Sequence, residues 1–409
     1  MSDREFSGFD VEGIVDAVRQ PPLDDLRATA RSRRGRRAGV MGLAAVAVVA
    51  GAASLTPLGR GSDQPQFASP TDSPAEPRAS SVVLLSDVAA VAVAQADGGC
   101  TISFAATSDA GRTWSSWRTA RNSGTCTKAI DAGGLGATDV RYSVLSERSY
   151  LVRFDDQWLL STDAGWTWQD ANTAITAVTA FPRNTRPVPC HQGCGAITQP
   201  LAVDPDSGRV FRLAEQGPSP YPPYNVYESP DRALWVTYWP GEDGNPALVA
   251  RSVDRGATWR TSRAPEGATS IGVAAVSAHE AYLLTEPQPT DPNAGQATGA
   301  SRLLHTTNGG ESWEDVGTDL PTTSVVRPFT IGSDGSLMVL DFEGSIAYVM
   351  ISRDGGRHFT RGRQQDGDGG VDANPGRAWL YGRDDPRTDG ADHVQVTTDG
   401  STWTRFPLP

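Results

Sequence analysis

From residue 81 to the C-terminus, the chain is a succession of short runs in which apolar and polar residues alternate, separated by turn residues. One unit reads SIGVAAVS (270–277), AYLLTEP (281–287), SRLLHTT (301–307) and SWEDVG (312–317). Alternation with a period of two is typical of strands that bury one face. The pattern therefore predicts four-stranded β units that follow one another along the chain.

One spelling, Ser/Thr-x-Asp-x-Gly-x-x-aromatic, returns between the third and fourth runs of these units. The Asp and Ser/Thr side chains can hydrogen-bond a turn, Gly permits a positive φ, and the aromatic residue covers the turn. Self-similarity at a fixed period indicates a repeat fold. We interpret the spelling as an architectural element. The copies are TSDAGRTW (107–114), STDAGWTW (161–168), SVDRGATW (252–259), TTNGGESW (306–313), SRDGGRHF (352–359) and TTDGSTW (397–403).

The spacing of the copies predicts the number of units. Their Asp or Asn positions are separated by 54, 91, 54, 46 and 45 residues, and 91 is close to twice the other values. A missing copy is therefore expected near Asp206, in the degenerate stretch DPDSGRVF (204–211). Residues 81–409 number 329, or 47 per unit for seven units, which is the size of a propeller blade. The expected fold is an all-β, seven-bladed propeller.

The repeated spelling resembles the Asp-box, also called the BNR repeat, and residues 81–409 resemble Asp-box propellers of the sialidase and photosystem-assembly-factor type. The resemblance implies that the boxes are structural and lie away from the functional face. A sialidase would also carry a Phe/Tyr-Arg-Ile-Pro motif ahead of the first box, but no Arg or Lys occurs between Ser80 and Gly111. The resemblance to sialidases also implies six blades, whereas the spacing here predicts seven. Sialidase chemistry is therefore not expected. The implied structural positions are Asp109, Asp163, Asp206, Asp254, Asn308, Asp354 and Asp399.

The first 80 residues do not belong to the repeats. Residues 38–58 carry no charge and are long enough to span a bilayer as one helix. The preceding RSRRGRR (31–37) places residues 1–37 in the cytoplasm by the positive-inside rule, so the propeller would lie outside. The alternative is a cleaved signal peptide with a site at Ala50-Gly51-Ala52, which would give a secreted protein.

The segments on either side of the apolar run contain few large apolar residues that could form a core. Residues 59–80 are rich in Pro and Ser and predict an extended linker. In the tail, Val11, Ile14, Val15 and Val18 have helical spacing, which makes Asp10 to Arg19 a candidate helix. A mostly disordered tail is the prediction, and a helix that docks a partner is the alternative. The helix would allow a third role, a transmembrane sensor that passes a signal inward.

Charge and composition exclude several functions. The net charge of −12 argues against a nucleic-acid partner. The five His are scattered without metal spacing, and DGDGGVDAN (366–374) resembles a calcium loop only in part, so we expect neither a metal nor a cofactor. Trp235 and Trp239 fall on one face of a predicted strand, where packing between blades and a sugar platform are both possible.

Four cysteines outside the membrane predict two disulfides. Cys100 and Cys126 flank one predicted hairpin, and CHQGC makes Cys190 and Cys194 a local clip. Zinc is the alternative at the clip, but two thiols and one adjacent His do not complete a tetrahedral site.

The predicted function is binding or scaffolding of a protein or glycan ligand, and the alternative is a carbohydrate-active hydrolase. The boxes occupy the turns between third and fourth strands, whereas the loops between second and third strands vary in length. Variable loops on a rigid scaffold usually carry the binding site. We therefore place the ligand on the opposite face from the boxes, against a largely acidic rim suited to a cationic or polyhydroxylated ligand. The candidate residues are His191, Glu242, Asp243, Asp384, Asp385 and Asp389.

Overall fold

The structure is a computed structural model, and the residues it describes all belong to one compact unit within residues 72–409. The candidate tail helix (10–19), the apolar segment (38–58) and residues 59–76 of the linker lie outside the described residues. Within the described residues, no helix is long and apolar enough to cross a membrane. The described ranges are 77–96, 101–121, 140–154, 157–190, 194, 196–215, 217–239, 247–264, 268–287, 301–320, 328–343, 346–366, 370–385 and 390–409.

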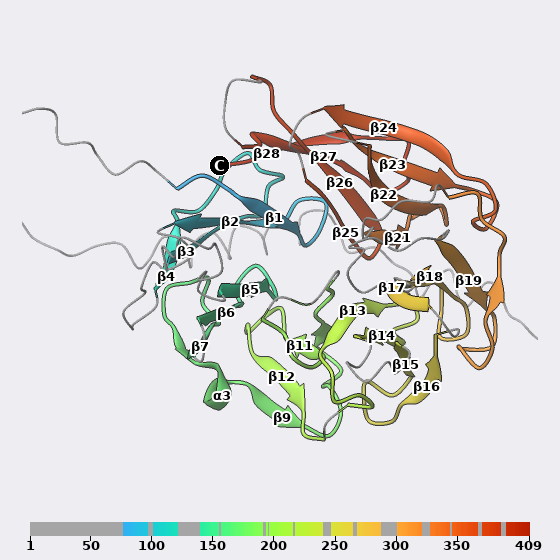
Figure 1. Ribbon diagram of the computed structural model, residues 1–409. Helices are drawn as coiled ribbons and strands as arrows, with labels where there is room; N and C mark the ends of the chain where they lie inside the picture. Colours follow the sequence, from blue (N-terminus) through green and yellow to red (C-terminus); the bar gives the residue numbers. More distant parts are fainter. Residues whose placement is uncertain are drawn as a thin grey trace, which may run out of the picture. The chain divides into compact units, whose positions relative to one another are not determined.

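The described strands form seven four-stranded sheets, which confirms the predicted seven-bladed propeller (Figure 1). In six blades the order across the sheet follows the order along the chain, and all neighbours are antiparallel. Blade 1 contains β1 (Ser81–Leu84), β2 (Ala90–Ala96), β3 (Thr101–Thr107) and β4 (Arg118–Arg121); blade 2 contains β5 (Val140–Val144), β6 (Tyr150–Phe154), β7 (Gln157–Ser161) and β8 (Gln169–Asp170). Blade 4 contains β13 (Pro223–Glu228), β14 (Leu234–Tyr238), β15 (Leu248–Ser252) and β16 (Arg260–Arg263); blade 5 contains β17 (Ala268–Ala275), β18 (Ala281–Pro287), β19 (Arg302–Thr306) and β20 (Glu314–Asp315). Blade 6 contains β21 (Phe329–Ile331), β22 (Leu337–Glu343), β23 (Ile346–Ser352) and β24 (Thr360–Asp366); blade 7 contains β25 (Val371–Asn374), β26 (Arg377–Gly382), β27 (His393–Thr397) and β28 (Thr404–Pro407).

Blade 3 is built differently from the other six. Its sheet order is β10 (Arg186–Pro187), β11 (Leu201–Val203), β12 (Val210–Leu213) and β9 (Thr176–Val178). The outermost strand, β9, therefore comes before the other three along the chain, after the short helix α3 (Ala171–Ala174), and it pairs in parallel with β12. Blade 3 consequently has no hairpin between its third and fourth strands.

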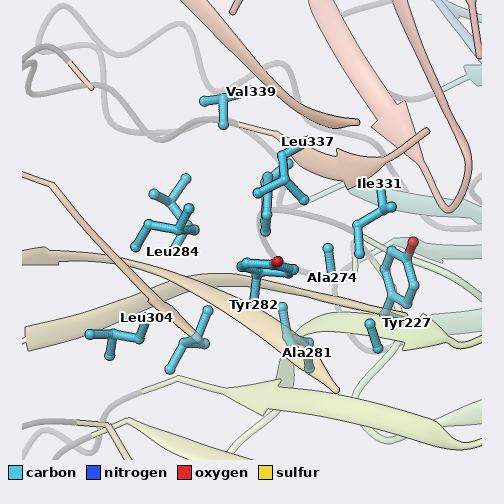
Figure 2. Packing of buried hydrophobic residues seen from close by; sticks show 14 of the residues in the cluster. Tyr227, Ala274, Ala281, Tyr282, Leu284, Leu304, Ile331, Leu337 and Val339 are labelled. Carbon is cyan, nitrogen blue, oxygen red and sulfur yellow. The ribbon is translucent and has the colours of Figure 1, made fainter. Parts of the chain in front are cut away.

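The core lies between neighbouring blades, because each sheet stacks on the next. Strand β14 is buried along its whole length, which explains why middle strands depart from strict alternation. Figure 2 shows the cluster that joins blades 4, 5 and 6, where the ring of Tyr282 lies among Leu284, Leu304 and Leu337. Tyr282 also stacks on the imidazole of His305, with ring centroids 4.5 Å apart. Burial of aromatic and aliphatic side chains between blades is the main stabilising contribution in such a fold.

Blades 7 and 1 close the ring without sharing a strand. The Tyr381 hydroxyl accepts a hydrogen bond from Val82 N (2.8 Å) and donates one to Val82 O (3.1 Å), and Asn374 Nδ2 donates to Leu84 O (2.8 Å). An apolar cluster that includes Val82 and Trp379 completes the contact. The closure therefore depends on side chains.

The repeated turns have one hydrogen-bond pattern. In the second copy, Asp163 Oδ1 accepts from Thr167 N (2.9 Å) and from Ser161 Oγ (2.9 Å), and its Oδ2 accepts from Thr167 Oγ1 (2.6 Å). Gly165 has a φ of 83°, and a Cβ there would lie 2.7 Å from Arg118 Cβ of blade 1. The pattern fixes the turn and lets it approach the preceding blade. Equivalent bonds to the main chain are made by Asp109, Asp254, Asn308, Asp354 and Asp399.

The turn predicted as the seventh copy differs from the prediction. Asp206 lies between β11 and β12, the second and third strands of blade 3. The side chain that holds this turn is Asp204, which accepts from Asp206 N (3.0 Å) and from Ser207 Oγ (2.8 Å). The reason is topological, because blade 3 takes its outermost strand from upstream and has no third-to-fourth hairpin.

Candidate functional site

A cavity of about 390 Å³ is bounded by the innermost strands of blades 7, 1 and 2 and by a segment of blade 3. The first wall is formed by β25, β1 and β5, and the second by residues that follow β10. The described lining residues are Ser81, Val82, Val83, Val140, Arg141, Tyr142, Ser143, Val144, Val188, Pro189, Cys190, Cys194, Ile197, Asp372 and Asn374. We call this the central cavity.

Cys190, Cys194 and Ala196 make contacts with two different blades. On one side, Ser143 Oγ of β5 donates to Cys194 O (2.9 Å) and accepts from Ala196 N (3.0 Å). On the other side, Cys190 and Val226 of β13 form an isolated antiparallel bridge. These contacts hold the wall of the central cavity in a defined position.

A disulfide joins Cys190 to Cys194, as predicted. Because the crosslink closes a very short loop, it limits the conformations open to this wall. Cys100 and Cys126 lie outside the described residues, so their pairing stays a prediction. Peptide mapping of the oxidised chain would check it.

Asp372 is the only carboxylate among the described residues that line the central cavity. Burial raises its pKa to about 7, although Ala373 N donates to Asp372 Oδ1 (2.8 Å) and stabilises the charged form. Its charge helps to raise the pKa of Tyr142, where burial is the larger cause and a hydrogen bond with Ser81 (2.6 Å) opposes the shift. Near neutral pH, the Asp372 carboxyl can thus either accept or donate a proton.

Sequence reasoning did not select Asp372. The residue belongs to DGDGGVDAN, which we considered as a calcium loop, but residues 371–374 of that stretch form the innermost strand of blade 7. An Asp inside a short alternating run was the available signal.

Two of the predicted rim residues, Asp384 and Asp385, lie in the connection between β26 and β27, whereas His191, Glu242, Asp243 and Asp389 lie outside the described residues. Arg405 donates two hydrogen bonds to the Asp384 carboxylate, at 2.8 and 2.6 Å. The charge of Asp384 is therefore countered, which weakens the acidic character that we expected at this point.

Asp384 also belongs to a group of possible metal ligands. One ligand atom each of Asp384, Asp392 and His393 lie within 4.8 Å of one another. Asp392 accepts from the His393 ring and from Asp384 N (2.7 Å), and Arg405 lies 3.6 Å from its carboxylate. The group is thus a network of an arginine, a histidine and two carboxylates that satisfy one another, and Gly382 makes room for it, since a Cβ there would lie 2.5 Å from His393 Nε2.

Trp235 lies in β14 and Trp239 directly follows it, but the two side chains have different environments. Trp235 is fully buried, its Nε1 donates to Ser277 O of blade 5 (3.1 Å), and its ring meets Trp313 edge-on. Trp239 is 43% exposed and lies edge-on against Tyr224. Trp235 therefore packs between blades, whereas part of the Trp239 ring is exposed to solvent.

No family model matches this chain, and no curated protein matches it by sequence. The fold is similar to solved propellers at low identity. A structure titled YCF48 bound to D1 peptide has a TM-score of 0.32 and 14% identity, covering 81% of each chain. A GH74 enzyme from Niastella koreensis has a TM-score of 0.34 and 12% identity over 78% of this chain, which spans 44% of that enzyme. A hypothetical selenium-binding protein from Sulfolobus tokodaii has a TM-score of 0.45 and 9% identity, covering 82% of this chain and 92% of that one. These similarities are too distant to inform the function.

Proposed function

We propose that the protein is a membrane-anchored binding module whose propeller receives its ligand at the central cavity and the loops around it. The observation that carries the proposal is the wall at Cys190, Cys194 and Ala196, which a disulfide and hydrogen bonds to blades 2 and 4 hold in place. A preformed concave site loses little conformational entropy when a ligand binds. The ligand class that we propose is a protein or a glycan.

The test uses the full chain on protein and glycan arrays. Cys194→Ser should release the wall and weaken binding of any ligand found, whereas Asp163→Ala, in a repeated turn, should leave binding unchanged. If Cys194→Ser binds as the native chain does while Asp163→Ala abolishes binding, the functional face is the one that carries the repeated turns and the proposal is wrong.

A carbohydrate-active hydrolase is the second candidate, and Asp372 is the observation that favours it. A carboxyl with a pKa near 7 in a cavity suits general acid catalysis. Most glycoside hydrolases need a second carboxylate, and among the described lining residues Asp372 stands alone, which is why we place binding first. Glycan hydrolysis that Asp372→Asn abolishes would establish the enzyme; binding without turnover would reject it.

The proposed location rests on residues 1–80. Residues 38–58 would anchor the protein with residues 1–37 in the cytoplasm and the propeller outside, joined by the linker at 59–80, and the tail helix would permit a sensor role. N-terminal sequencing of the mature protein separates the anchor from a cleaved signal peptide: a terminus near Gly51 to Ala53 would reject the anchor.

We propose that the repeated turns are Asp-boxes of the sialidase and photosystem-assembly-factor type. Three features support this assignment: the shared spelling, the place between third and fourth strands, and the hydrogen bonds. In these bonds the carboxylate or amide oxygen accepts from main-chain N–H groups two to four residues later. The role that follows is to hold the blades, so the boxes themselves would not contact the ligand.

A further inference from the structure

Two cavities with shared lining residues lie beside strand β12 of blade 3. One, of about 350 Å³, lies toward blade 4 and includes Tyr238, and the other, of about 330 Å³, lies toward blade 2 and includes Trp158. Thr198, Gln199 and Arg212 line both cavities. We call the two together the blade-3 cleft; it is distinct from the central cavity, which shares none of these three residues.

Arg212 is a half-buried cation that lines both cavities. It lies in β12, opposite Leu201 of β11. Across the described part of the chain, its guanidinium has no hydrogen-bond or ion-pair partner, and the described lining of the cleft contains no carboxylate. Arg255, by comparison, donates to the main chain at Phe181 and Thr185. A partly buried guanidinium without a partner is costly, and its donors remain free for an external acceptor.

Tyr238 supplies a second unsatisfied group in the cleft. The residue is only 1% exposed, and its buried hydroxyl has no hydrogen-bond partner among the described residues. Gly217 approaches this hydroxyl, since a Cβ there would lie 3.0 Å from it. A buried hydroxyl is normally satisfied in a folded protein. The Tyr238 hydroxyl and the Arg212 guanidinium therefore both lack a partner in one cleft.

The side of the cleft toward blade 2 has an apolar part. Leu151 and Trp158 of blade 2 face Leu201 of blade 3 across it, with Ile175 and Ile197 nearby. A ligand that filled the whole cleft would therefore need an apolar body and one polar end.

We propose that the blade-3 cleft binds a small amphipathic carboxylic acid. The carboxylate pairs with the Arg212 guanidinium, the Tyr238 hydroxyl hydrogen-bonds the same polar end, and the apolar body lies against Trp158 and Leu151. A carboxylate fits better than a phosphate, because a single guanidinium matches a monoanion and can bind both of its oxygens. The site is independent of the function proposed for the central cavity.

The experiment measures binding to the full chain by calorimetry with N-acetylphenylalanine and with its amide, N-acetylphenylalaninamide. The two probes share their apolar body and differ only in the carboxylate. We expect the acid to bind at least about tenfold more tightly than the amide, since a charge-assisted hydrogen bond is lost. Arg212→Gln should weaken binding of the acid about 10- to 100-fold and leave the amide unchanged.

Two further variants separate a ligand role from a structural one. Tyr238→Phe removes a hydroxyl that has no partner, so it should weaken binding of the acid while the melting temperature stays the same or rises. Arg183→Gln, which removes an exposed cation elsewhere, should change neither. The proposal is overturned if acid and amide bind equally, if Arg212→Gln binds the acid like the native chain, or if the acid shows no binding at about 10 mM.

Discussion

Replacing Asp163 by Ala tests how the repeated turns stabilise the propeller. The substitution removes one carboxylate that accepts three hydrogen bonds, from Thr167 N, Thr167 Oγ1 and Ser161 Oγ, at 2.9, 2.6 and 2.9 Å. Ser161 is buried, whereas Thr167 is exposed. Water can therefore replace the carboxylate at Thr167, but it replaces it poorly at Ser161.

The expected cost follows from this difference. Leaving a buried donor unsatisfied costs about 1–3 kcal/mol, and a donor that reaches water costs less, so we expect a loss of about 1–2 kcal/mol. In a propeller of this size, that loss lowers the melting temperature by about 2 °C. Denaturant unfolding of the full chain, monitored by tryptophan fluorescence, measures the same difference with better precision.

The chain itself supplies the matched control, because its fourth copy carries Asn308. Asn308 Oδ1 accepts from Ser312 N (3.0 Å) and its Nδ2 donates to Ser312 Oγ (2.8 Å). Asp163→Asn can make the same bonds, so it should cost less than half as much as Asp163→Ala.

The pH dependence provides an independent check. Desolvation opposes the shift, but hydrogen bonds from Thr167 and Ser161 outweigh it and lower the pKa of Asp163. A group whose pKa is lower in the folded state stabilises the protein above its unfolded pKa of about 3.9, and this stabilisation is lost as the pH falls through the folded pKa. At acidic pH, the free energy of unfolding of the native chain should therefore approach that of Asp163→Asn. Equal losses for Asp163→Asn and Asp163→Ala at pH 7, or unchanged stability of both, would refute the reasoning.

Four further substitutions have clear expected outcomes. Ala164 has a φ of 61°, where the corresponding residues of the fourth and fifth copies are glycines, so Ala164→Gly should raise the unfolding free energy by about 0.5–1 kcal/mol in denaturant titration. Trp235→Ala should cost about 3–5 kcal/mol because the side chain is fully buried, and Trp239→Ala, at 43% exposure, less than about 1 kcal/mol; similar losses would contradict the assigned packing. Burial raises the pKa of Asp372 to about 7, so its contribution is fully present below about pH 4 and is lost as the pH rises to 7. Asp372→Asn should abolish that decline, measured as melting temperature against pH, and an unchanged profile would refute the assignment.

The number of blades could be predicted because it is encoded locally. Each repeated turn places its hydrogen-bonding residues within seven positions, so spelling and spacing alone locate the third-to-fourth hairpin in six blades. Blade 3 could not be read in this way, since the pairing of β9 with β12 joins residues that are more than 30 positions apart and is parallel. The 91-residue gap was correctly assigned to an extra blade, but the carboxylate that holds its turn is Asp204 and not Asp206.

The candidate sites were predicted less well, because they combine residues from several blades. The clip of Cys190 and Cys194 could be found, since the two residues are only four positions apart in the sequence. Asp372 and the pair of Arg212 and Tyr238 gave no such signal: the cavities that they line are assembled from strands of different blades. The visible anomalies were single charged residues inside short apolar runs: Asp372 in residues 371–374 and Arg212 in VFRLA (210–214).

The way in which blades 7 and 1 meet has a consequence for rearranged genes. Since every sheet is drawn from one continuous stretch of chain, a circularly permuted gene can begin at any blade boundary and encode the same seven sheets. A permutant opened between β9 and β10 would be the exception. Its N-terminal part would supply β10 to β12 and its C-terminal part β9 to one sheet. Main-chain hydrogen bonds between β9 and β12 would then close the ring, which in the natural order is closed through side chains. Moving the chain ends would therefore change the type of closure without changing the architecture.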